Sequence, residues 1–169
     1  MFSVGDTVVY STQGVCRIEE IKVMKAGKTK SEYYLLKPVA DARSAVYVPV
    51  NNEKLMSKMR AVLTKSELDA LICDCVGRPK EWIEDDAARK VHCEETIKSG
   101  DRSELIRLIV MLYEHRESLK DQKRSFHSID AQYLKTAEHL LHDEFAYVLG
   151  IAAADVPEYI EGKMSGAPR

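Results

Sequence analysis

The feature that most constrains the fold of this chain is an abrupt change in residue pattern after Asn51 and Asn52. Over residues 6–50 the apolar side chains come in the short runs TVVY, GVCRIEEI, EYYLLK and AVYVPV, which are rich in β-branched and aromatic residues and are separated by turn-forming residues. Strands this short and this close together predict a small SH3-like or Tudor-like β barrel. Beyond residue 55 the apolar positions recur at helical spacing. We therefore expect an α+β chain, with a β-barrel domain at 1–55 and an all-α helical bundle domain at 56–169.

Local signals indicate where the first two helices begin and end. Thr64 and Glu67 have the spacing of a capping box, which satisfies two amide donors and starts a helix. Gly77 and the proline two residues later end it. The pattern that follows predicts a second helix over about 80–98.

The same signals predict the remaining helices. Asp101 and Glu104 repeat the capping pattern before the run ELIRLIVMLYEH, which is apolar around most of its circumference and is expected to be the central helix of the bundle. A long helix is expected over 128–149, where Gly150 ends it, and a short one near 156–163.

Composition and charge exclude several classes of protein. With 45% hydrophobic and 31% charged residues, the chain is expected to be globular rather than disordered. No stretch approaches the ~20 apolar residues needed to cross a bilayer, and the first residues lack signal-peptide features, so we expect a cytoplasmic protein without membrane contact. Residues 1–55 carry eight Lys/Arg and six Asp/Glu, against seventeen and twenty-one in residues 56–169. The helical half therefore lacks the overall positive charge typical of proteins held to DNA by charge alone.

Motifs for catalysis are not found in the sequence. It contains no Walker loop, GxGxxG, GxSxG or HExxH. His139 and His142 have carboxylates as neighbours, which suits a metal or acid–base site, but this spacing is more typical of the polar face of a helix. We expect a non-enzymatic protein with no catalytic residue and no cofactor.

Cys73, Cys75, His92 and Cys93 have the side-chain types of zinc ligands. Two thiols at positions i and i+2 of a helix point about 200° apart, however, so they do not easily share one ion. We expect no metal and interpret these cysteines as reduced residues of the interior.

Three segments occur in a fixed order, VGDTVVYSTQGVCRIEEI, EYYLLKP and AVYVPVNN. Together they resemble the N-terminal module of the CarD/CdnL bacterial transcription regulators, which is shared with transcription-repair coupling factor. The resemblance implies a barrel that docks on the RNA polymerase β subunit. It also implies a helical domain that contacts the minor groove of promoter DNA without reading its sequence and stabilises the open complex. Such a regulator needs no catalysis, because preferential binding to one of two promoter states shifts their populations.

The expected docking element is the run from Ser44 to Val50, an edge strand that adds to a sheet of the polymerase. In better-known members a basic residue stands at the positions of Tyr47 and Met24, so the alternative is that these two side chains pack the barrel or decorate its surface. The expected polymerase-binding residues are Lys22, Met24, Lys25, Arg43, Val46, Tyr47, Val48 and Pro49.

The expected DNA contact centres on Trp82, placed in or just before the first turn of its helix, where an exposed aromatic side chain can unstack a base step. Four carboxylates at positions 81, 84, 85 and 86 repel phosphate, so the alternative is a tryptophan buried in the core or between domains. The candidate DNA-binding residues are Arg78, Lys80, Trp82, Arg89, Lys90, Lys123, Arg124 and Lys135. If they do not touch DNA, the chain is a protein-interaction adaptor on the polymerase. The sequence predicts no oligomeric state.

Overall fold

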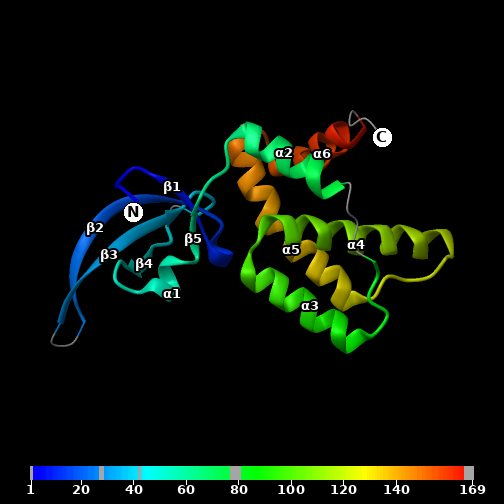
Figure 1. The fold of residues 1–169 in the computed structure, drawn as a ribbon, viewed down its shortest axis with the longest axis horizontal. Helices are drawn as coiled ribbons and strands as arrows, with labels where there is room; N and C mark the ends of the chain where they lie inside the picture. Colours follow the sequence, from blue (N-terminus) through cyan, green and yellow to red (C-terminus); the bar gives the residue numbers. More distant parts are fainter. Residues whose placement is uncertain (1, 27–28, 42, 77–80, 166–169) are drawn as a thin grey trace. The chain divides into compact units, whose positions relative to one another are not determined.

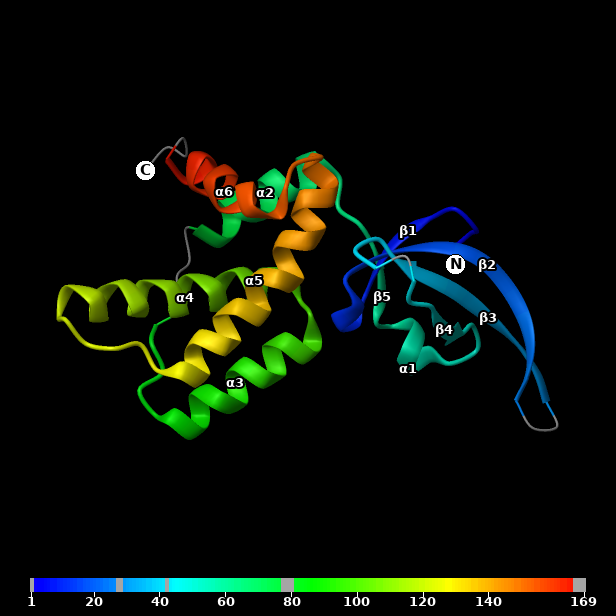
Figure 2. The same cartoon turned by 180° about the vertical axis from the view of Figure 1, so that it is seen from behind.

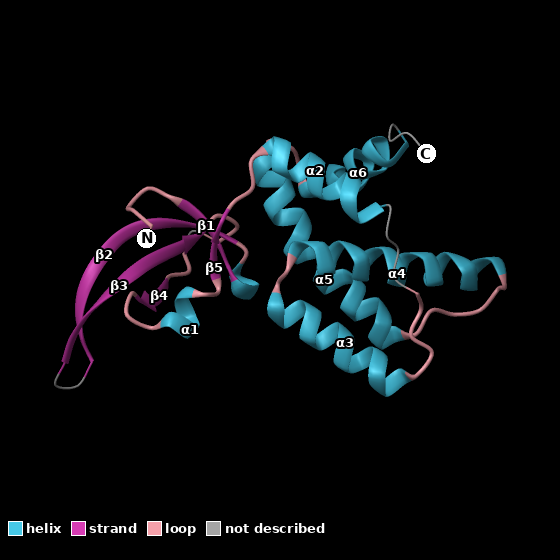
Figure 3. Cartoon of the chain, in the orientation of Figure 1, coloured by secondary structure: helices cyan, strands magenta, loops and turns pink. Residues whose placement is uncertain are grey.

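The computed structural model describes residues 2–26, 29–41, 43–76 and 81–165, and it divides into two compact units, residues 1–62 and 63–169. The first unit is an antiparallel five-stranded sheet and the second is helical, which confirms the α+β class (Figures 1 and 3). The boundary falls a few residues beyond position 55, because a last short strand returns to the sheet at Met59–Ala61.

The sheet has the strand order β4-β3-β2-β1-β5. Its strands are β1 (Thr7–Tyr10), β2 (Val15–Ala26), β3 (Thr29–Pro38), β4 (Val46–Pro49) and β5 (Met59–Ala61), with the short helices η1 (Ser11–Gln13) and α1 (Glu53–Met56) between them. The predicted closed barrel is wrong: in the described part of the chain β4 and β5 are the two edges of an open sheet. They have only four and three residues, which leaves little backbone for the pairing that closure requires.

One face of the sheet forms the core of the first unit. Alternation along each strand directs every second side chain inward. The buried residues are Val8, Tyr10, Cys16, Ile18, Tyr34, Leu36, Val48 and Met59. Strand β2 has a bulge between Ile18 and Glu20. Beyond Val23 and Glu32, where the bonds to β4 and Val50 end, β2 and β3 continue as a two-stranded ribbon that runs past the other strands (Figure 2).

The second unit is built from α2 (Lys65–Val76), α3 (Asp86–Ser99), α4 (Arg102–Asp121), α5 (Ser128–Leu149), η2 (Ala153–Asp155) and α6 (Val156–Ser165). Helix α4, expected to be central, packs against α2, α3 and α5, whereas α5 packs against α2, α3, α4, η2 and α6 and is therefore the central helix. The bounds predicted for α5 are confirmed, and Gly150 ends it in the left-handed conformation (φ 67°). No helix among the described residues has both the length and the hydrophobicity needed to cross a bilayer.

Helix α3 begins later than the sequence pattern predicts. Asp85 is its N-cap and accepts a hydrogen bond from the Ala88 amide at 2.7 Å. The carbonyl oxygens of Ile83 and Glu84 accept from the Arg89 guanidinium, so a side chain satisfies them instead of helical amides. Residues 81–85 are therefore not helical, and Trp82 lies before the helix rather than in its first turn.

Candidate functional site

The outer edge of β4 is a surface with main-chain groups directed away from the sheet. Among the strands that the structure describes, β4 pairs with β3 alone. Just after β4, the Val50 amide donates to the Glu32 carbonyl at 2.9 Å. Because hydrogen-bonded residues alternate in an antiparallel pair, Val48 and Val46 also bond to β3. Tyr47, between them, directs its N–H and C=O to the free edge.

Several predicted docking residues lie together on the outward face of the sheet. Tyr47 and Pro49 of β4 are on this face, as are Lys22 and Met24 of β2, because they alternate with inward-facing neighbours. Tyr33 and Leu35 of β3, which are partly exposed, lie between these residues on the same face. The pairs across the strands are Tyr47 with Leu35, Pro49 with Tyr33, Lys22 with Tyr33, and Met24 with Ser31.

The other predicted docking residues are placed differently. Val48 is fully buried, so its side chain belongs to the core and is not available to a partner. Val46 is half-buried on the same inner side, and Lys25 lies on the opposite face of the ribbon from Met24. Arg43 is exposed in the loop before β4, where its Nε atom lies 3.6 Å from Oδ1 of Asp41.

In the helical unit, Trp82 lies between two side chains that cover both faces of its ring. On one side the His115 ring of α4 is stacked on it, with centroids 3.5 Å apart and planes 6° from parallel. On the other side the Arg89 guanidinium of α3 lies 4.5 Å from the ring centroid. Trp82 is half-buried and packs against the helical core. Its ring edge, rather than a ring face, is what it presents outward.

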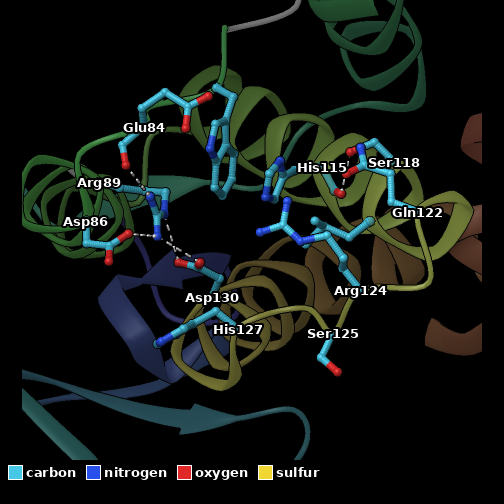
Figure 4. A pocket seen from close by; sticks show the side chains of 12 residues that line it. Glu84, Asp86, Arg89, His115, Ser118, Gln122, Arg124, Ser125, His127 and Asp130 are labelled. Atoms are coloured by element: carbon cyan, nitrogen blue, oxygen red, sulfur yellow. Dashed lines mark hydrogen bonds and ion pairs between the residues drawn. The ribbon is translucent and has the colours of Figure 1, made fainter.

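A buried ion pair holds Arg89 in this position (Figure 4). Arg89 and Asp130 are only 6% and 5% exposed. The Arg89 Nε and Nη2 atoms donate to the two carboxylate oxygens of Asp130, each at 3.1 Å, and Nη2 also donates to Asp86 at 2.6 Å. Burial by itself lowers the pKa of Arg89, but the bonds to Asp130 and Asp86 outweigh it and raise that pKa. Arg89 therefore lies inside the domain, where it orients Trp82, and not on a surface that meets a phosphate.

A cavity of about 540 Å³ opens beside this cluster. Trp82, His115 and Arg124 contribute to its wall together with Glu84 and His127. Burial, followed by the nearby charge of Arg89, lowers the pKa of His115, so this imidazole is neutral at pH 7. The cavity thus combines an aromatic edge with charges of both signs.

The remaining candidate DNA-binding residues lie at the surface or outside the described residues. Lys123, Arg124 and Lys135 are exposed. Lys90 is also exposed, and its Nζ atom lies 3.9 Å from Oε1 of Glu94. Arg78 and Lys80 lie outside the described residues.

Two of the four carboxylates near Trp82 have structural roles that the sequence did not reveal. Asp85 caps α3, and Asp86 binds Arg89. Their presence therefore reflects the folding of the segment before α3. Nothing in the local sequence pointed to Asp130 or His115 as partners of this cluster, because both come from other helices.

The cysteines of the helical unit are spread over the interior and the surface. Cys75 and Cys93 are buried in the core, and Cys73 is exposed. Burial raises the pKa of Cys93 to about 11, which keeps its thiol protonated. In the described part of the chain, no three His, Cys, Asp or Glu residues are grouped as a metal ion requires.

Comparison with known families identifies the first unit. Residues 2–60 match the family model of the CarD-like/TRCF RID domain. The matched residues contain all five strands except the last residue of β5, and they include the β4 edge described above. The match confirms the resemblance of the N-terminal motifs. The first unit of this chain therefore belongs to the CarD-like/TRCF RID family of RNA-polymerase-interacting domains.

Proposed function

We propose that this chain is a non-enzymatic transcription regulator that binds RNA polymerase and promoter DNA together. Its first unit docks on the polymerase β subunit by adding β4 to a sheet of that subunit. Its helical unit contacts the minor groove at the upstream edge of the melted promoter and slows closure of the bubble. Binding one promoter state more tightly is enough for this effect, and a coupling of about 1–3 kcal/mol changes occupancy roughly 5- to 150-fold.

The observation that carries the docking proposal is the unpaired outer edge of β4 in a domain of this family. Strand addition needs a row of free main-chain donors and acceptors beside side chains that provide specificity. Tyr47 offers both groups at the edge, and the outward face beside it carries Met24 and Lys22. Tyrosine, with a large rigid ring and a polar tip, is enriched at such interfaces.

A proline substitution at Tyr47 tests this mode of docking. Because the Tyr47 amide is not used inside the sheet, Tyr47→Pro removes a donor from the free edge alone. We expect at least about ten-fold weaker binding to purified polymerase, or about 1.4 kcal/mol. This is at the upper end of the roughly 0.5–1.5 kcal/mol of one hydrogen bond, because the ring also blocks close approach of a strand. Tyr47→Ala keeps the amide and is the matched control. Equal losses in the two variants contradict strand addition.

The DNA proposal is supported by exposed basic residues of the helical unit, of which Arg124 lines the same cavity as Trp82. Lys90, Lys123, Arg124 and Lys135 are at the surface, and such side chains hold phosphates without reading sequence. Trp82 contributes an aromatic group at the wall of the neighbouring cavity. An aromatic or apolar side chain of this kind is what inserts between base steps at a widened minor groove.

Trp82→Ala tests the DNA contact. We expect it to shorten the lifetime of open promoter complexes under competitor challenge while binding to polymerase is retained. Tyr113→Ala is the matched control, because Tyr113 is also an aromatic residue on this unit with an arginine, Arg116, over its ring at 4.7 Å. A second variant, Trp82→Phe, keeps an aromatic ring and separates loss of the contact from loss of folding.

A second candidate function is an adaptor that binds polymerase without touching DNA. The burial of Arg89 and the covering of both faces of Trp82 favour it. An unchanged promoter lifetime in Trp82→Ala, together with normal polymerase binding, assigns this function instead.

A further inference from the structure

The β2–β3 ribbon carries a positive charge that extends beyond the residues paired with β4. From residue 21 to residue 31 the sequence contains no acidic residue. Lys22, Lys25 and Lys30 are exposed there. We call these three residues and the strands that carry them the basic ribbon.

The basic ribbon projects beyond the rest of the sheet. Strand β1 pairs with β2 only as far as Arg17, and β4 pairs with β3 only from Tyr33 to Leu36. The pairing of β2 with β3 continues to Ala26 and Thr29. Beyond Val23 and Glu32, both outer edges of the ribbon are therefore unpaired among the described residues, and Figure 1 shows it extending past the other strands.

No ion pair neutralises the lysines of the basic ribbon among the described residues, although Glu32 is exposed on the same face as Lys25 and Lys30. Lys25 lies directly opposite Lys30 on one face, an arrangement of like charges that destabilises a hairpin. Lys22 is on the other face. None of these three lysines forms an ion pair with a described carboxylate, whereas Lys37, nearer the core, pairs with Glu19 at 2.9 Å. An anionic partner relieves this repulsion.

Two kinds of anionic partner fit a basic surface, an acidic protein segment and a nucleic acid. Ile21 and Val23 are 40% and 58% exposed on the same face as Lys25, which suits a protein. The lysines, however, occupy both faces of a narrow ribbon, so no single protein surface meets them all. A two-stranded β-ribbon fits the major groove, where phosphates lie on both sides of it. The distribution of charge therefore favours nucleic acid.

We propose that the basic ribbon binds the phosphate backbone of duplex DNA without reading its sequence. This contact lies on the polymerase-interacting unit and is separate from the contact proposed for Trp82. It gives the chain a second attachment to DNA that does not require the helical unit.

The test uses the full chain and a fluorescein-labelled duplex of about 20 base pairs with random sequence, followed by anisotropy between about 50 and 200 mM salt. Each phosphate contact contributes about 0.9 to the slope of log K against log salt. Loss of two contacts in K25Q/K30Q makes this negative slope shallower by about 1.8. Between these salt concentrations the wild-type affinity therefore falls about 12-fold more than that of the variant. K54Q/K58Q changes the same charge elsewhere in the unit and is the matched control.

The outcomes separate this proposal from the one for the helical unit. A lower slope in K25Q/K30Q, with K54Q/K58Q unchanged and circular dichroism intact, supports the basic ribbon as a DNA contact. An unchanged slope overturns it, even where K123Q/R124Q shows that the helical unit does bind DNA. If K25Q/K30Q instead loses the binding to labelled polyglutamate that the wild type shows, while its salt slope on DNA is unchanged, the proposal is overturned and the partner is an acidic protein segment.

Discussion

Replacing Asp130 with asparagine removes the negative charge that faces the buried Arg89 guanidinium. Asp130 accepts two hydrogen bonds from Arg89 inside the helical unit, and both side chains are almost fully buried. Breaking a buried ion pair from one side costs about 3–5 kcal/mol, because the remaining charge stays out of water. Asp86 and two carbonyl groups still hold Arg89 in the variant, so we expect the lower figure, about 3 kcal/mol.

The matched comparison is Asp86→Asn. Asp86 binds the same guanidinium at a shorter distance, 2.6 Å, but its side chain is 84% exposed. Exposed ion pairs contribute less than about 1 kcal/mol, because water screens the charges. The two substitutions thus differ in burial more than in chemistry.

Urea unfolding followed by tryptophan fluorescence measures both effects. Trp82 is the single tryptophan, so its emission reports on the helical unit alone. With an unfolding slope of about 2 kcal/mol per molar urea, Asp130→Asn lowers the midpoint by about 1.5 M and Asp86→Asn by less than about 0.5 M. Equal shifts in the two variants refute the reasoning, since they mean that burial does not decide the strength of these ion pairs.

Three further predictions concern the helical unit. Burial lowers the pKa of His115 below the usual value of about 6.5 for histidine, so the unfolded chain takes up this proton first as pH falls. Stability should therefore be full above about pH 6.5 and decline below it, and His115→Gln should weaken the pH dependence of the urea midpoint between about pH 7 and 5. Glu144 is 1% exposed and accepts a hydrogen bond from Arg102 Nε at 2.9 Å. Glu144→Gln should lower the free energy of unfolding, measured in urea, by about 3 kcal/mol, and a loss below about 1 kcal/mol argues against a buried ion pair. The Tyr159 hydroxyl of α6 donates to Asp69 of α2 at 2.6 Å. Tyr159→Phe should lower the free energy of unfolding by about 1 kcal/mol and speed amide hydrogen exchange in α6. Unchanged exchange in α6 contradicts a role of this hydrogen bond in holding α6 on α2.

Features set by neighbouring residues were predictable from the sequence. The Thr64 hydroxyl and the Glu67 carboxylate make the reciprocal bonds of a capping box, with the Thr64 amide donating to Glu67 at 2.8 Å. Helix α5 ends at Gly150 because a glycine adopts the left-handed conformation without strain. The side chain of Val48 was expected to contact the polymerase, but alternation along β4 directs it into the core and leaves Tyr47 exposed.

Features set by distant residues were not predictable in this way. The Arg89–Asp130 pair joins positions 41 residues apart, and neither residue has a local pattern that names the other. The same guanidinium donates to the carbonyls of Ile83 and Glu84, which precede the N-cap Asp85, so the start of α3 also depends on a contact that the local pattern does not show. The closed barrel failed for a similar reason, because closure depends on whether β4 and β5 meet and not on the character of either strand.

The covering of Trp82 sets a condition on any insertion into DNA. To unstack a base step, the ring must leave His115, a contact of about 0.5–1.5 kcal/mol, and Arg89, a contact of about 0.5–2 kcal/mol. Stacking on a base returns about 1–3 kcal/mol, so the exchange is close to balanced. Trp82 alone therefore cannot drive the helical unit onto promoter DNA. In the proposed regulator the driving free energy has to come from phosphate contacts and from tethering by the polymerase-bound unit, which raises the local concentration of DNA around Lys123 and Arg124.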